Sequence, residues 1–470
     1  MYGMGLSGHP KMTISVFKVF YNKRPPIVKH YRCYRNFDMN AFRNKLRYNL
    51  DICNGNTIMG YDEFIEIFMT LLNKDAPMKK KVIRGNNAPF MSKPLSKEIM
   101  HRSKLKNKFN KIPTEENRNL YKKQRNICVN LLRKEKKSYF NNLDLKVFED
   151  NRKFWKAIKP LFSDKHHFSQ RNVIIEEKGK LISNNTEVAE ILNNYFIDAV
   201  ESLDIDPFII ADRNSEGDTE KSHIENIINK YETHPSILKI KENVSLDEKF
   251  VFNDICSEEI YEYISKLDPK KAGIENDIPA SVLVSSIDIV STYLTNIYNE
   301  SKNSNLFPPT LKLGTITPIH KKKVKTLIKK DYRPVTLLPL VSKIYEKKMH
   351  KEISLYMDTF LSPYIFGYRK NHSTEHCLLV MIEKMKKALD FQQCSGAVLT
   401  DLSKAFDCLN LDLLIAKLSA YGFEDSALHL IYNYLKDRKQ RTKVNASYSN
   451  WKDLKHGVPQ GSNLGPTIYL

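Results

Sequence analysis

Two acidic residues lie close together near the end of the chain, and the first of them stands where a carboxylate could serve metal-dependent chemistry. Asp401 follows the apolar run Gly396–Leu399, and Asp407 comes shortly after it. Such a run predicts a buried β-strand, so we expect Asp401 at a strand end, where a rigid backbone holds its carboxylate at the edge of a cleft. Mg²⁺ prefers oxygen ligands, and the Leu402 carbonyl offers a second one. The alternative for a lone acid after an apolar run is a helix N-cap or a turn.

A stretch rich in Gly and Pro, Gly457–Pro466, follows about 50 residues later and contains the sequence Pro459, Gln460, Gly461. Pro and Gly predict a turn at this point, and the turn is expected to open a helix. Free backbone N–H groups at a helix start can donate hydrogen bonds to a phosphate, or contact a base pair. The alternative is a turn with a purely structural role.

These two stretches resemble motifs of the reverse transcriptases of non-LTR (LINE-type, jockey-like) retrotransposons. Three further segments resemble motifs of the same family, although Ile365 replaces the usual Gln in the last of them: Pro269–Pro279, Asp331–Pro339 and Leu361–Thr374. The resemblance covers residues 250–470, nearly half of the chain. It implies a right-hand polymerase fold of the α+β class, with fingers and a partial palm built on an antiparallel sheet with helices.

The resemblance also implies roles for single residues. Asp401 is the catalytic carboxylate and, with the carbonyl of Leu402, a metal ligand. Phe406 takes the position of the steric gate, an aromatic residue that excludes a ribose 2′-hydroxyl. The alternative interpretation of Phe406 is an ordinary core residue. Asp407 is expected to make a structural hydrogen bond. Residues implied to bind the incoming dNTP are Lys321, Arg333, Phe406, Gln460 and Gly461.

The charge of the chain indicates a polyanionic partner. Its formal net charge is +21, and residues 79–137 hold 19 Lys and Arg against 4 Glu, a net of +15. Lys and Arg displace the counterions condensed on nucleic acid, so this block predicts a nucleic-acid-binding helix, with a solvated helix face as the alternative. Leu120–Phe140 is expected to be helical. The residues predicted to contact nucleic acid are Lys122, Lys123, Arg125 and Arg369.

The sequence divides into four predicted segments. Residues 1–78 are of uncertain fold, with a possible endonuclease tail and a strand-like run at Ile14–Tyr21. Residues 79–200 form a mostly helical basic region, 201–249 an acidic linker, and 250–470 the fingers and partial palm. Seven scattered Cys without a C-x-x-C pair indicate reduced thiols and no zinc site. We therefore expect an intracellular protein of nucleus or cytoplasm, neither secreted nor membrane-bound.

The implied function is RNA-templated DNA synthesis by a retrotransposon. The reaction needs dNTPs, an RNA template, a DNA primer or target, and two Mg²⁺ ions in the complete enzyme. The alternative is a catalytically inactive nucleic-acid-binding fragment of such an element. A basic scaffold protein with fortuitous motifs is a third interpretation.

One further element of the family, an aromatic-x-Asp-Asp hairpin, is not found within the 470 residues. With Asp401 as its one metal-binding carboxylate, the chain alone is expected not to polymerise DNA. The Asp401 strand is also expected to lack a sheet neighbour, which exposes apolar surface at Val398, Ile468 and Leu470.

Overall fold

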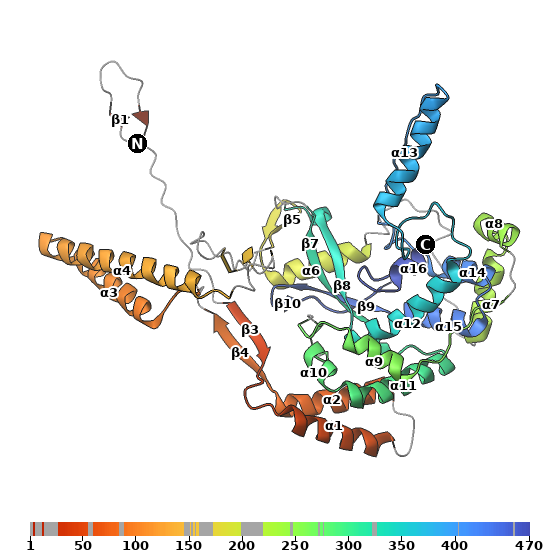
Figure 1. Ribbon diagram of the computed structural model, residues 1–470, viewed down its shortest axis with the longest axis horizontal. Helices are drawn as coiled ribbons and strands as arrows, with labels where there is room; N and C mark the ends of the chain where they lie inside the picture. Colours follow the sequence, from red (N-terminus) through yellow and green to blue (C-terminus); the bar gives the residue numbers. More distant parts are fainter. Residues whose placement is uncertain are drawn as a thin grey trace. The chain divides into compact units, whose positions relative to one another are not determined.

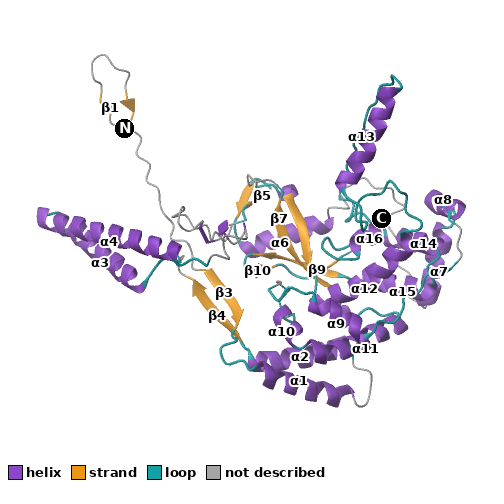
Figure 2. Ribbon diagram, in the orientation of Figure 1, coloured by secondary structure: helices purple, strands orange, loops and turns teal. Residues whose placement is uncertain are grey.

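The computed structural model forms two compact units, one made of residues 1–31 and 80–170, the other of 32–79 and 171–470 (Figures 1 and 2). The structure describes residues 3–4, 12–13, 27–54, 60–83, 89–144, 151, 154–155, 157–158, 173–198, 220–244, 248–270, 273–275, 277–321, 327–402, 404–454 and 456–470. The strand predicted at Ile14–Tyr21 lies outside these residues.

The first unit is dominated by a helical hairpin, α3 (Lys93–Lys111) and α4 (Glu115–Asn141), whose helices pack side by side. Ser92 and Thr114 cap the two helix starts with their side chains, as N-cap hydroxyls do. Thus the helix predicted over Leu120–Phe140 is confirmed. Two short strand pairs precede the hairpin in the sequence: β1 (Gly3–Met4) with β2 (Met12–Thr13), and β3 (Ile27–Arg32) with β4 (Met78–Ile83).

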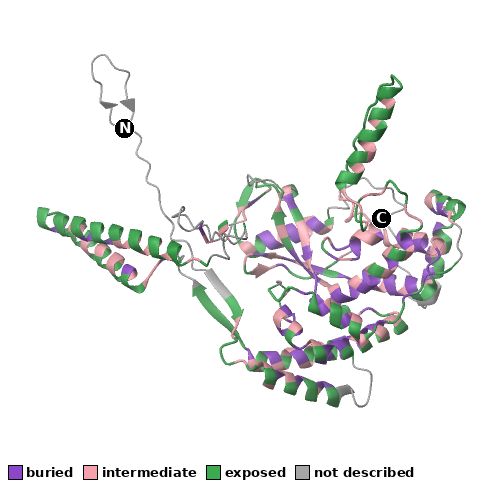
Figure 3. Cartoon of the chain, in the orientation of Figure 1, coloured by how far each residue is buried: buried purple, intermediate pink, exposed green. Residues whose placement is uncertain are grey.

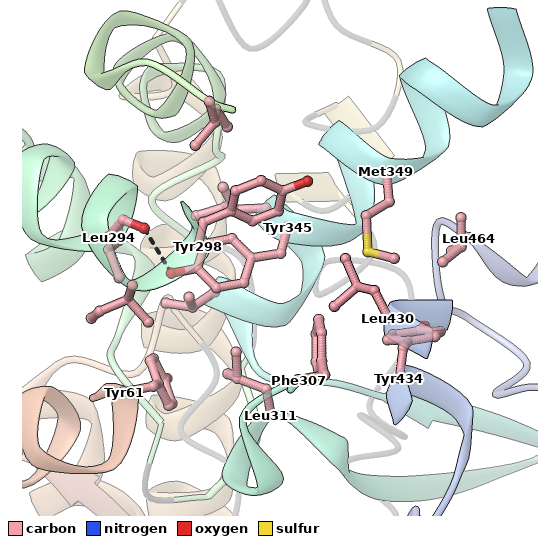
Figure 4. Close-up of a cluster of buried hydrophobic side chains, with 14 of the residues drawn as sticks. Tyr61, Leu294, Tyr298, Phe307, Leu311, Tyr345, Met349, Leu430, Tyr434 and Leu464 are labelled. Carbon is pink, nitrogen blue, oxygen red and sulfur yellow. Dashed lines mark hydrogen bonds between the residues drawn. The ribbon is translucent and has the colours of Figure 1, made fainter. Parts of the chain in front are cut away.

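A helical core fills the second unit. Its main elements are α1 (Met39–Asn54), α2 (Tyr61–Asp75), α9 (Ser257–Ser265), α10 (Ala280–Ser285), α11 (Ile287–Ser304), α12 (Leu340–Met357), α14 (Leu411–Ala420) and α15 (Asp425–Leu435). Figure 4 shows the centre of this core, where the Tyr345 hydroxyl donates to the Leu294 carbonyl at 2.9 Å. Among the described helices, none is both long enough and apolar enough to cross a lipid bilayer.

The sheet of the second unit runs in the order β10-β9-β7-β8, with β11 also paired to β9. Its strands are β7 (Leu313–His320), β8 (Tyr332–Leu337), β9 (Lys439–Val444), β10 (Ser447–Tyr448) and β11 (Lys452–Asp453), with 3₁₀ turns η3 (Pro309–Lys312) and η4 (Lys329–Asp331) before β7 and β8. The runs Gly314–His320 and Arg441–Val444 are strand-like in sequence, and the structure confirms a strand at each. The expectation of an antiparallel sheet is wrong for one pair, because β7 and β9 run parallel. The long helical connection between them allows that direction.

Residues before the polymerase-like region complete this unit. The hairpin β5 (Ile175–Glu177) and β6 (Lys180–Ile182) leads into α6 (Asn185–Asp198), which packs on β9 and β10. The predicted acidic linker, 201–249, is helical in its second half, where α7 (Glu220–Tyr231) and α8 (Pro235–Asn243) pack on α14. Apolar side chains inside the acidic sequence explain the difference: Ile224, Ile227 and Tyr231 are buried.

The buried strand predicted before Asp401 is wrong. After α13 (Thr374–Asp390), a helix with no buried side chain (Figure 3), residues 393–402 form an exposed coil in which Val398 is 92% exposed. The N–H and C=O groups of a strand need a neighbouring strand, and the described residues offer none here. Exposure of Val398 was expected, but Ile468, on α16 (Gly465–Tyr469), is buried in the core.

Candidate active site

The two motifs that carry the resemblance are joined through their backbones. The N–H of Val458 donates to the carbonyl of Phe406 at 2.9 Å, and that of Gly457 to the carbonyl of Leu409 at 3.0 Å. Gly457 has φ +77°, and a Cβ there would lie 2.5 Å from the Phe406 carbonyl oxygen. A glycine is therefore required for this close approach, which brings together segments about 50 residues apart in sequence.

Asp407 and Gln460 form the side-chain link between these segments. The Gln460 Nε2 donates to Asp407 Oδ1 at 2.9 Å. Burial raises the pKa of Asp407, while the Gln460 hydrogen bond and the charges of Lys404 and Lys321 act in the opposite direction. The structural hydrogen bond predicted for Asp407 is confirmed, and its donor is the Gln predicted to face the nucleotide.

The Pro459–Gly461 turn is also fixed to the sheet. The N–H of Thr336, on β8, donates to the Gln460 carbonyl at 2.8 Å. Gly461 has φ +128°, and a Cβ at this position would lie 2.5 Å from the Thr336 carbonyl oxygen. Beside the turn, a cavity of about 30 Å³ is lined by Asp407, Gln460 and Thr336 among others. A cavity of this size is large enough to hold a water molecule.

A buried carboxylate that the sequence did not reveal supports the end of the turn. Glu346, on α12, is fully buried and accepts from the Asn463 N–H at 2.7 Å and from the Tyr434 hydroxyl at 2.9 Å. Burial raises the pKa of Glu346, against the charge of Arg438, which stacks on the Tyr434 ring. In the sequence, the one sign that Glu346 is buried was its position beside the apolar Ile344 and Tyr345. The same pattern also fits a Glu on the exposed face of a helix.

The predicted metal ligands lie in the exposed coil. The side chains of Asp401 and Leu402 are solvent-exposed, and the described residues contain no cluster of three His, Cys, Asp or Glu that could hold a metal. Oxygen donors are the right type for a divalent cation that keeps several waters and binds substrate phosphates. The Asp401 carboxylate and the Leu402 carbonyl thus fit such an ion as part of its ligand set.

Lys321 and Arg333 lie at the loop end of the β7–β8 hairpin. The Lys321 N–H donates to the Asp331 carbonyl at 2.7 Å, and its ammonium donates to the Lys330 carbonyl at 2.9 Å. Arg333 is exposed on β8, paired in register with Ile319. Side chains alternate along a strand, so Arg333 faces away from Thr336 and the turn. The structure therefore brings Lys321, but not Arg333, toward Asp407.

Phe406 and Arg369 are both engaged within the protein. The half-buried Phe406 ring packs against Tyr469, with centroids 5.0 Å apart, and against Tyr368 at 5.9 Å. The Arg369 guanidinium is 9% exposed and donates to Asp358 Oδ1 at 2.7 and 2.9 Å. With its donors turned inward, Arg369 holds its own loop together.

The α3–α4 hairpin carries the predicted nucleic-acid contacts of the first unit. Residues 93–141 hold 15 Lys and Arg against 4 Glu, a net of +11. Lys122, Lys123 and Arg125 are all exposed, whereas Gln124 and Cys128 are buried in the seam between the helices. The Gln124 amide donates to Glu98 Oε2 at 2.5 Å across this seam. Glu135 likewise accepts from the Ser92 hydroxyl at 2.7 Å, so two of the four Glu are engaged inside the hairpin, and its surface is strongly positive.

Comparison with known proteins gives the same family as the motifs. The family described as reverse transcriptase (RNA-dependent DNA polymerase) matches residues 319–470. A probable RNA-directed DNA polymerase from transposon BS of Drosophila melanogaster is 33% identical over 45% of this chain and 24% of its own length. The RNA-directed DNA polymerase from mobile element jockey of Drosophila funebris is 23% identical over 93% of this chain and 46% of its own length. The chain spans less than half the length of these curated relatives. Residues 319–470 thus match the reverse transcriptase family, and the chain is similar to RNA-directed DNA polymerases of jockey-like mobile elements.

Proposed function

We propose that this chain provides the fingers and the first part of the palm for RNA-templated DNA synthesis by a retrotransposon. The observation that carries the proposal is the joining of the Phe406–Asp407 segment to the Pro459–Gly461 turn by backbone and side-chain hydrogen bonds. The relatives named as RNA-directed DNA polymerases support the same reaction. Its substrates are dNTPs, an RNA template and a DNA primer end.

In this proposal most of the predicted site residues have a chemical task. Asp401 and the Leu402 carbonyl hold Mg²⁺, which stabilises the negative charge that develops on the phosphate oxygens. Lys321 offers a point charge to the triphosphate, whereas Arg333 lies on the other face of β8 and has no contact in this proposal. Phe406 excludes a ribose 2′-hydroxyl. The Gln460 amide, held by Asp407, faces the base pair together with the Gly461 backbone.

A second candidate function is nucleic-acid binding without catalysis. It is favoured by the exposed coil around Asp401, which presents one carboxylate to solvent. The strongly positive α3–α4 hairpin serves either function, because phosphate contacts do not depend on the polymerase site.

Primer extension on an RNA template separates the two. The chain is joined at Leu470 to the palm segment that follows the matched region in the jockey relative, and Asp401→Ala is made in the same protein. Extension that Asp401→Ala abolishes supports the polymerase. If both proteins bind the template but neither extends the primer, the binding function is supported instead.

The role of the hairpin is tested by the salt dependence of RNA binding. Each phosphate contact to a single strand contributes about 0.7 to the slope of log K against log salt. Changing Lys122, Lys123 and Arg125 to Ala should therefore reduce the slope by up to about 2, equally for all sequences. The matched control changes three exposed lysines of α13 to Ala: Lys384, Lys386 and Lys387. A slope that falls equally in the control, or a loss that depends on RNA sequence, contradicts the assignment.

A further inference from the structure

Tyr195 lies at the end of α6, outside the region that the polymerase family matches. The helix is fixed on the sheet by Asn193, whose amide donates to the Asn450 carbonyl at 3.2 Å and accepts from the Thr442 hydroxyl at 3.2 Å. Its apolar face, including Phe196, packs into a cluster with Ile316 of β7. The position of Tyr195 is thus set by contacts elsewhere along the helix.

Two ammonium groups lie over the Tyr195 ring. The Nζ of Lys329 is 5.8 Å from the ring centroid, and that of Lys404 is 5.5 Å away. Lys329 belongs to the turn before β8 and Arg333, and Lys404 lies three residues after Asp401. The ring therefore joins the two segments to which dNTP contacts are assigned.

Contacts with the β5 strand hold Lys329 near this ring, and Lys404 lies within the electrostatic reach of Asp407. Glu177, on β5, accepts from Lys329 at 3.0 and 3.1 Å, and the N–H of Glu176 donates to the Leu327 carbonyl at 3.0 Å. The negative charge of Asp407 acts on Tyr195, and the charges of Lys404 and Lys321 act on Asp407. Three lysines, Lys321, Lys329 and Lys404, thus lie around two carboxylates. Glu177 accepts a hydrogen bond from Lys329, and Asp407 accepts one from Gln460.

We infer that Tyr195 is a positioning residue whose ring holds Lys329 and Lys404 in place to receive the triphosphate of the incoming nucleotide. This inference rests on the proposed polymerase function. The electron-rich face of an aromatic ring attracts an ammonium group within about 6 Å. A long lysine side chain loses conformational entropy when it binds an anion. A ring that already orders two lysines lowers this cost without itself touching the nucleotide.

Binding of fluorescent mant-dATP with MgCl₂ to the full chain tests the inference. Tyr195→Leu removes the ring and should weaken binding about 5- to 30-fold, as expected for one to two cation–π contacts. Tyr195→Phe keeps the ring and should restore most of the affinity. Equal loss in Phe and Leu variants, or no loss in the Leu variant, overturns the inference. Thermal unfolding of each variant verifies that it is folded.

A second pair of variants keeps the outcome clear if Tyr195→Leu fails to fold. Lys329→Met and Lys404→Met retain the aliphatic stems and should each weaken mant-dATP binding, whereas unchanged binding in both overturns the inference. Lys321→Ala tests the proposed nucleotide site itself. If that variant binds mant-dATP normally, the proposed triphosphate site is refuted. If it loses binding while Tyr195→Leu does not, only the role of Tyr195 is refuted.

Discussion

Asp277 should make the stability of the second unit depend on pH in a predictable direction. Its buried carboxylate accepts from the Leu340 N–H, at the start of α12, and from the Ile278 N–H, both at 2.9 Å. Burial raises the pKa of Asp277 to about 6, although both hydrogen bonds and the charge of Lys343 favour the ionised form. Asp277 thereby satisfies a helix-start donor that Pro339, which has no side-chain cap, leaves open.

The sign follows from the two pKa values. An unfolded Asp has a pKa of about 3.9, so the folded state binds the proton more tightly. The resulting stabilisation is present below about pH 4 and is lost as the pH rises through 6. A difference of about two pKa units corresponds to about 3 kcal/mol, of which about 2 kcal/mol is lost between pH 4.5 and 7.5.

Asp277→Asn removes this titration. It leaves one of the two backbone donors without an acceptor, which costs about 1–3 kcal/mol. Urea unfolding of both proteins across this pH range should show the variant gaining about 2 kcal/mol relative to the original chain. Asp268→Asn is the matched control, because the exposed Asp268 accepts from a backbone N–H in the same loop. A difference between Asp277→Asn and the original chain that stays constant with pH would refute the reasoning.

Three further predictions concern the joined motifs. Gly461→Ala should lower the free energy of unfolding by at least about 2 kcal/mol, because its φ is positive and a Cβ would strike the Thr336 carbonyl; an unchanged melting temperature contradicts this. Asp407→Asn and Gln460→Glu should each destabilise, and the double variant should recover about 1 kcal/mol by reversing donor and acceptor; additive losses exclude the coupling. In the chain extended with the jockey segment, Phe406→Ala should raise the ratio of ribonucleotide to deoxynucleotide incorporation. If that ratio stays constant while polymerase activity is retained, Phe406 is an ordinary core residue.

Local patterns predicted much of the fold. The helix over α4 follows from a run without Gly or Pro, and the strands β7 and β9 follow from strand-like composition. Glycines such as Gly457 marked the turn beside the motif. The run before Asp401 was misjudged because a strand requires a partner, which composition does not show. Glu346 was missed because a buried acid depends on donors, Tyr434 and Asn463, that lie far along the chain.

The packing of α6 on the sheet has a consequence for synthesis on the ribosome. The Asn193 amide meets the Asn450 carbonyl across 257 residues of sequence, and β7 pairs with β9 from Leu313 to Lys439. At about 5–20 residues per second, the ribosome needs roughly 13–50 seconds after completing α6 to deliver its partner. Until β9 is made, the apolar face of the helix is covered only in part, by Ile175, Ile316 and Tyr332, and one edge of β7 has no partner strand. Nascent chains of this protein should therefore be most susceptible to chaperone capture or aggregation between the synthesis of α6 and that of β9.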